Sequence, residues 1–121
     1  MTRQVLLVED ESLLVMVLED MLPELGYEVA ASAPSVEAAL HLLGSHDPDL
    51  AILDVNLGGT HSFPVADALA QRGIPFVFAS GYGESILPDR YAGRPLVPKP
   101  YGRNELEAAL AQLPGRQPAE G

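Results

Sequence analysis

The chain has 121 residues, 47% of them hydrophobic, and its 17 acidic and 7 basic side chains leave a net charge of −10. This length and composition fit one globular domain with a single core, and the absence of cysteine excludes disulfides and thiolate chemistry. The negative charge makes nucleic acid and anionic membrane surfaces poor partners, and without a visible signal peptide or membrane-spanning run we expect a cytoplasmic protein.

Apolar strand-like runs alternate with amphipathic helix-like segments along the chain. Runs of the buried-strand type cover residues 4–10, 27–31, 49–54, 74–80 and 95–98. Helical spacing of apolar residues predicts helices over residues 11–26, 35–44, 63–73 and 102–113. The side chains that this spacing turns toward the core are Leu14, Leu18, Met21, Leu22, Leu25, Val36, Ala39, Leu40, Leu43, Leu106, Ala109, Leu110 and Leu113.

The remaining segments lack this periodicity. Residues 55–62 are expected to form a loop, with unusual backbone angles at Gly58 and Gly59. Residues 81–94 are rich in glycine and proline, so a fourth helix there would be short or irregular. We therefore expect one domain over residues 1–113 and a flexible polar tail over residues 114–121.

Continuous apolar strands separated by amphipathic helices are typical of a parallel sheet with helices on both faces. The sequence thus predicts an α/β fold with a doubly wound, five-stranded parallel sheet. Ligands of such folds bind beyond the carboxyl ends of the strands. Glu9, Asp10, Asp54, Ser80 and Lys99 follow or close four of these strands, so we expect them to converge at one edge of the sheet.

A cluster of this composition suits a divalent cation and a phosphoryl group. Neighbouring carboxylates repel one another, which raises the pKa of at least one of them unless a cation is bound. Oxygen ligands with room for water suit Mg²⁺. A lysine and a hydroxyl add the positive charge and the hydrogen-bond donor that phosphoryl transfer needs, and a carboxylate can itself be the nucleophile.

The motifs VLLVEDE, PDLAILDVNLGG, FVFASGYG and VPKP resemble, in this order, those of the receiver domain of two-component response regulators. The match covers residues 4–113 and implies the flavodoxin-like (CheY-like) fold with strand order 2-1-3-4-5. It also implies that Asp54 is the phospho-acceptor. Glu9, Asp10, Asp54 and the backbone carbonyl of Asn56 would hold Mg²⁺.

The stretch FASGYG further resembles single-domain receivers that carry a Phe-Ala-Thr-Gly-aromatic motif. Ser80 would stand for the threonine and Lys99 for the family's lysine, whose bond to Pro100 is cis in typical members. Leu96 takes the place of the aromatic switch residue of most receivers. We therefore expect residues 81–94 to reorder on phosphorylation, as Ser80 is drawn toward the phosphoryl group, with Tyr82 on the partner-facing surface.

On this resemblance the chain is a phospho-acceptor that catalyses only its own phosphorylation and dephosphorylation. The phosphoryl donor would be a sensor histidine kinase of the HWE or HisKA2 type. Since no DNA-binding segment follows Leu113, we expect the chain to act through protein contacts, as an adaptor, a phosphorelay shuttle or a phosphate sink.

Two alternatives remain at this point. The first is a Mg²⁺-dependent phosphatase working through an aspartyl-phosphate, but Asn56 stands where such enzymes carry a second aspartate. The second is a degenerate receiver that binds its partner without phosphorylation. The complete set of acidic pair, acceptor, hydroxyl and lysine disfavours this second alternative.

Overall fold

A parallel sheet with the strand order β2-β1-β3-β6-β7 forms the centre of the computed structural model, which describes residues 2–81, 87–94 and 96–115. Its strands are β1 (Arg3–Val8), β2 (Tyr27–Ala33), β3 (Leu50–Asp54), β6 (Phe76–Ser80) and β7 (Leu96–Pro98). All neighbouring strands run parallel. In the order of these five strands along the chain this is 2-1-3-4-5, so the predicted sheet is confirmed.

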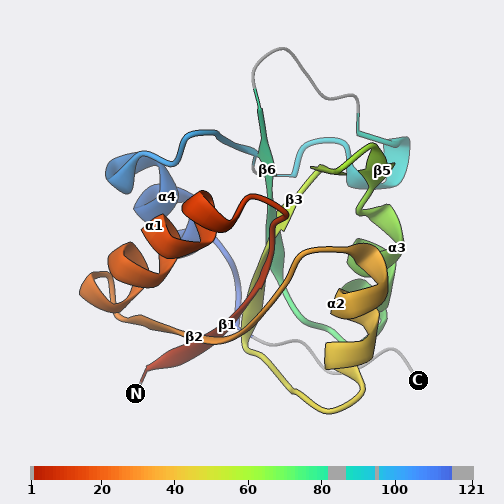
Figure 1. The fold of residues 1–121 in the computed structure, drawn as a ribbon, viewed down its shortest axis with the longest axis horizontal. Coiled ribbons are helices and arrows are strands. Elements are labelled where there is room, and N and C mark those ends of the chain that lie inside the picture. The colour runs from red at the N-terminus through yellow and green to blue at the C-terminus, as the bar shows by residue number, and fades with distance from the viewer. Residues whose placement is uncertain (1, 82–86, 95, 116–121) are drawn as a thin grey trace.

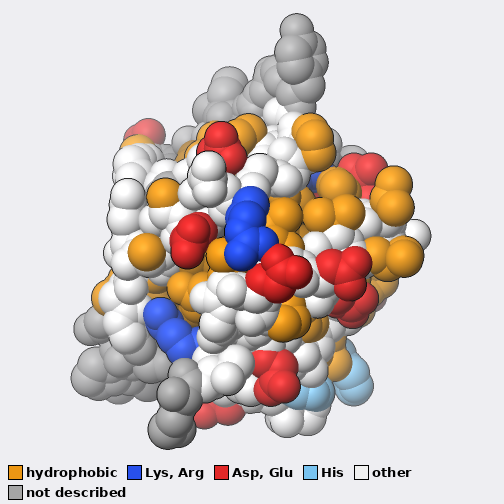
Figure 2. Space-filling model, turned by 90° about the vertical axis from the view of Figure 1, so that its left-hand side faces the viewer, with side chains coloured by type: hydrophobic (Ala, Val, Ile, Leu, Met, Phe, Trp, Pro, Cys, Tyr) orange, Lys and Arg blue, Asp and Glu red, His pale blue; other side chains and the backbone are white. Residues whose placement is uncertain are grey.

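Helices cover both faces of the sheet (Figure 1). Helices α1 (Ser12–Glu24) and α4 (Arg103–Ala111) lie on one face, and α2 (Val36–Leu43) and α3 (Phe63–Gln71) on the other. Each face has its own group of buried apolar side chains, because every residue of β3 and β6 is buried and their side chains alternate between the two faces. The outer surface on the α1 and α4 side carries more acidic than basic side chains, as Figure 2 shows.

Among the described residues between β6 and β7, helical structure is limited to one turn, in agreement with the short or irregular helix predicted there. This turn is the 3₁₀ helix η1 (Asp89–Tyr91). Tyr91 is buried and its ring packs edge-on against Phe76 and Phe78, at centroid distances of 5.7 and 5.5 Å. These contacts anchor η1 to the core of the α3 face.

The loop predicted over residues 55–62 is wrong, because this segment forms a small antiparallel hairpin. Its strands are β4 (Asn56–Leu57) and β5 (Thr60–His61), paired with each other and not with the main sheet. The two glycines between them have φ of 58° and 94°, as predicted for Gly58 and Gly59. Positive φ at both central positions is what a tight hairpin turn of this length requires.

The inward direction predicted for Leu40 is also wrong, since this residue is 41% exposed. Ala39 and Leu43 form the buried side of α2, and Leu42 packs beside them. In a helix of only eight residues the apolar side chains surround most of the axis, so spacing alone does not single out the inward stripe.

Two further predictions concern the C-terminal end of the chain and the membrane. The flexible tail predicted for residues 114–121 lies outside the described residues, apart from Pro114 and Gly115. The carbonyl of Pro114 accepts a hydrogen bond of 3.3 Å from the Arg3 guanidinium. Within the described part of the chain, no helix combines the length and the apolar character needed to cross a membrane.

Candidate functional site

Strand register brings the predicted site residues to one edge of the sheet. Val8 pairs with Leu53, so the residues that follow them, Glu9 and Asp54, lie side by side beyond β1 and at the end of β3. Asp54 pairs with Ala79 in turn, which places Ser80 one residue beyond it on the neighbouring strand. The amide of Lys99 donates to the Ser80 carbonyl at 2.9 Å, which continues the ladder past β7.

Three carboxylates form the centre of this edge. Glu9, Asp10 and Asp54 each offer one oxygen, and these atoms all lie within 4.8 Å of one another. Glu9 and Asp54 are buried, at 3% and 2% exposure, whereas Asp10 is exposed. An all-oxygen donor set that is open to water on one side fits a hard divalent cation that keeps some of its water ligands.

The ammonium group of Lys99 lies among these carboxylates. Its Nζ is 2.8 Å from Asp54 Oδ2, 3.3 Å from Glu9 Oε2 and 3.4 Å from Glu11 Oε1. Burial by itself lowers the pKa of this lysine, but the hydrogen bond and the charge of Asp54, together with Glu9, outweigh burial and raise it. Lys99 therefore stays charged and compensates part of the negative charge.

Both oxygens of the Glu9 carboxylate accept hydrogen bonds. The Glu11 amide donates to Oε2 at 3.1 Å, beside Lys99, and the Tyr101 hydroxyl donates to Oε1 at 3.0 Å. Burial, and the negative charge of Asp54, raise the pKa of Glu9 in spite of these donors. Tyr101 was missed by the sequence analysis, because nothing in the sequence indicates how far its hydroxyl reaches.

The β4–β5 hairpin lies against the acidic cluster. A side chain added at Gly58 would begin 3.6 Å from Asp10 Oδ2. The amide of Asn56 donates to Asp54 Oδ1 at 3.3 Å, and the Asn56 side chain accepts from the Gly59 amide at 2.9 Å. The Asn56 side chain is therefore engaged in the turn, and the role predicted for its backbone carbonyl as a metal ligand stays a prediction.

The remaining predicted residues lie beside the cluster or outside the described residues. Ser80 is buried and its hydroxyl donates to the Gly81 carbonyl at 3.1 Å. The bond between Lys99 and Pro100 is cis. Leu96 and Pro100 are exposed, and the partner-facing position predicted for Tyr82 lies outside the described residues.

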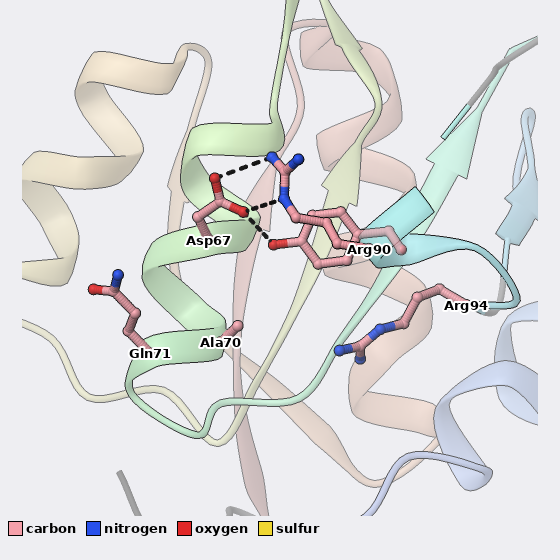
Figure 3. A pocket seen from close by; sticks show the side chains of 6 residues that line it. Asp67, Ala70, Gln71, Arg90 and Arg94 are labelled. Carbon is pink, nitrogen blue, oxygen red and sulfur yellow. Dashed lines mark hydrogen bonds and ion pairs between the residues drawn. The ribbon is translucent and has the colours of Figure 1, made fainter. Parts of the chain in front are cut away.

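A separate polar network joins α3 to η1 and lines an open surface pocket with a volume of about 490 Å³ (Figure 3). Asp67 accepts hydrogen bonds from Arg90 Nε at 2.9 Å, from Arg90 Nη2 at 3.1 Å and from the Tyr91 hydroxyl. The hydrogen bonds from Arg90 and then from Tyr91 hold the pKa of Asp67 below its usual value. This network fixes the segment that follows residues 82–86, on the side of the sheet opposite α1 and α4.

Comparison with known proteins identifies the family to which this fold belongs. Residues 5–111 match the model of the response regulator receiver domain. The solution structure of SdrG from Sphingomonas melonis Fr1 is 44% identical, with a TM-score of 0.81 over 91% of this chain and 94% of SdrG. The solution structure of the BeF3-activated conformation of SdrG from Pseudomonas melonis Fr1 is 43% identical, with a TM-score of 0.76 over 89% of this chain and 92% of SdrG.

Among curated proteins, the transcriptional regulatory protein PdtaR of Mycobacterium tuberculosis is 32% identical over 112 residues. The match covers 89% of this chain but 55% of PdtaR, so the chain spans about half the length of that relative. The match to the family model of the receiver domain covers residues 5–111, and it does not depend on the length of PdtaR. The chain therefore belongs to the receiver domain family of two-component response regulators.

Proposed function

We propose that the chain accepts a phosphoryl group on Asp54 from the phosphohistidine of a sensor histidine kinase. The observation that carries this proposal is the buried contact of 2.8 Å between Asp54 and Lys99 within a cluster of three carboxylates. Lys99 holds Asp54 Oδ2, and Oδ1 makes a long hydrogen bond of 3.3 Å with the Asn56 amide. Oδ1 is thus the oxygen better placed to attack phosphorus.

In this reaction the Asp54 oxygen forms a bond to phosphorus as the bond between phosphorus and the donor histidine nitrogen breaks. Glu9, Asp10, Asp54 and the backbone carbonyl of Asn56 would hold Mg²⁺, which when bound offsets the negative charge of the carboxylates and of the incoming group. Lys99 stays positively charged and would transfer its contact to a phosphoryl oxygen. Asp10 is exposed, so the cluster is open on the side from which a donor must approach.

The phosphorylated state would be read through protein contacts. Ser80 lies on the neighbouring strand β6, one residue beyond the partner of Asp54. We propose that the Ser80 hydroxyl gives up its hydrogen bond to the Gly81 carbonyl and donates to a phosphoryl oxygen instead. The exposed residues Leu96 and Pro100 would belong to the partner-facing surface. The same proposal includes a kinase of the HWE or HisKA2 type as phosphoryl donor. It also includes a role for the chain as an adaptor, a phosphorelay shuttle or a phosphate sink. The BeF3-activated conformation described for SdrG supports a phosphoryl-responsive receiver.

Intact-mass analysis after incubation with Mg²⁺ and acetyl phosphate tests the proposal. We expect the wild type to gain the mass of one phosphoryl group, Asp54→Asn to gain none, and removal of Mg²⁺ to prevent the gain. Asp67→Asn is the matched control, because this carboxylate belongs to the separate network on α3, and it should be labelled like the wild type. Labelling of Asp54→Asn would refute the assignment of the acceptor.

Two other outcomes would favour the alternative functions. Many turnovers of a phosphate ester per chain would indicate a phosphatase. No mass gain in the wild type, either from acetyl phosphate or from a phosphorylated sensor kinase of the same organism, would indicate a receiver that binds its partner without phosphorylation.

A further inference from the structure

We infer that Tyr101 is a positioning residue of the metal site, whose hydroxyl holds the Glu9 carboxylate in the orientation that metal binding needs. The inference rests on the proposed role of Glu9 as a metal ligand. It concerns a residue to which the sequence motifs assign no part.

The position of Tyr101 is fixed by packing at one end and by a hydrogen bond at the other. Its ring belongs to the buried group between the sheet and helices α1 and α4, and the residue is 7% exposed. The chain continues through Gly102 into α4, whose Leu106 amide donates to the Gly102 carbonyl at 2.9 Å. The ring is therefore held in this buried group, and its hydroxyl reaches Glu9 Oε1 at 3.0 Å.

Glu9 needs such a support for two reasons. A glutamate has one more rotatable bond than an aspartate, so its carboxylate has more orientations to lose on binding a cation. The carboxylate is also buried, at 3% exposure, where an oxygen without a donor is costly. Lys99 and the Glu11 amide both donate to Oε2, and Tyr101 donates to Oε1. Tyr101 thus determines which way the plane of the carboxylate turns.

Phenylalanine at this position would fill the same space and leave Oε1 without this donor. The carboxylate would then be held at Oε2 alone, so its plane could turn more easily about its last bond, and metal binding would have to restore the orientation. Removal of a hydrogen-bond partner that orients a metal ligand typically lowers metal affinity by about 10- to 100-fold. Since Lys99 and the Glu11 amide remain, we expect a loss of about tenfold, at the lower end of this range.

The metal affinity is measured by titrating the purified chain with Mn²⁺ and following the electron paramagnetic resonance of the free ion. Mg²⁺ is then added as a competitor to obtain its own affinity. Tyr101→Phe should bind both ions about tenfold more weakly than the wild type. Tyr91→Phe is the matched control: it also removes the hydroxyl of a buried tyrosine that donates to a carboxylate, but that carboxylate is Asp67 and the hydrogen bond is only partly buried. The control should keep the wild-type affinity within about twofold, although both variants lose one hydrogen bond and some thermal stability.

An affinity of Tyr101→Phe within about twofold of the wild type, or tighter, would overturn the inference, as would a wild type that binds neither ion. An equal loss in Tyr91→Phe would show a general effect of stability, and would overturn it too. The titration needs no phosphoryl donor, so it decides the role of Tyr101 even if Asp54 is never labelled. If Asp54 is labelled, Tyr101→Phe should reach the wild-type extent of labelling at saturating Mg²⁺.

Discussion

Replacing Lys99 by methionine should destabilise the fold markedly when divalent metal is absent. The change keeps an unbranched apolar stem but removes the ammonium group that lies 2.8 Å from Asp54 and 3.3 Å from Glu9. The side chains of these two carboxylates are only 3% and 1% exposed, so they would be left close together without compensation. Removing one partner of a buried ion pair costs about 3–5 kcal/mol. Because exposed Asp10 opens the cluster to water, we take about 3 kcal/mol, which corresponds to roughly 10 °C in Tm for a domain of this size.

The loss should depend on pH in a defined direction. The pKa of Lys99 is raised in the folded chain, so its contribution is complete below the ordinary lysine pKa and disappears only as the pH rises through the raised value. The pKa of Glu9 is also raised, first by burial, so the native state gains stability as the pH falls through that pKa and Glu9 takes up a proton. Without Lys99 this pKa rises further. The difference between wild type and Lys99→Met should therefore shrink on going from neutral pH to about pH 5.

Urea denaturation followed by circular dichroism, with a chelator present, measures both effects. Arg103→Met is the matched control, because this variant removes a cation that pairs with Glu24 at the exposed surface. The control should lose less than about 1 kcal/mol and show little change with pH. Mg²⁺ should restore more stability to Lys99→Met than it adds to the wild type, since the ion replaces a missing charge. A loss below about 1 kcal/mol, or one independent of pH, would refute the account of a buried, charge-compensated cluster.

Two further predictions concern the neighbourhood of the site. Gly58→Ala places a side chain at φ of 58° and should lower the free energy of unfolding by about 1 kcal/mol, visible as a lower Tm. The new side chain would lie at an ordinary contact distance of 3.6 Å from Asp10, so Mg²⁺ affinity should stay nearly unchanged. An unchanged Tm would contradict this prediction. Ser62→Ala removes a fully buried hydroxyl without a hydrogen-bond partner among the described residues, and should raise the free energy of unfolding by about 1 kcal/mol in urea denaturation. In the wild type the Ser35 hydroxyl accepts a hydrogen bond from the Ala38 amide, so Ser35→Ala should instead lower the free energy of unfolding by about 1 kcal/mol. If both variants lowered the free energy of unfolding, the hydroxyl of Ser62 would have a partner.

The sheet could be predicted from the sequence because its signals are long and repeated. Five apolar runs alternate with helical segments, and a parallel order follows from that alternation. The β4–β5 hairpin was missed because each of its strands has two residues, too few for any alternation of polar and apolar positions to appear. Leu40 shows the same limit in a helix, where eight mostly apolar residues leave the inward side undefined by spacing.

The carboxylates and the lysine at the centre of the site could be predicted from the sequence, whereas the contact of Tyr101 with Glu9 could not. Glu9, Asp54 and Lys99 each lie at a strand end, and the parallel topology alone brings such ends together. Tyr101 reaches Glu9 through the length of its side chain and the packing of its ring under two helices, and neither follows from position in the sequence. Ser80 is intermediate, because its place beside Asp54 was predictable and its hydrogen bond to Gly81 was not.

The expected reordering of residues 81–94 is limited at the C-terminal end of this segment, because η1 is held in place there. Asp89–Tyr91 is held to α3 by the hydrogen bonds of Asp67 and to the core by the edge-on packing of Tyr91 against Phe76 and Phe78. A movement that begins when Ser80 turns toward a phosphoryl group would have to break these contacts in order to displace η1. Breaking them would expose a buried aromatic ring, which is costly compared with one hydrogen bond from Ser80. The change at Ser80 is therefore expected to leave η1 in place, so that Arg90 and Tyr91 form the fixed end of the segment that responds.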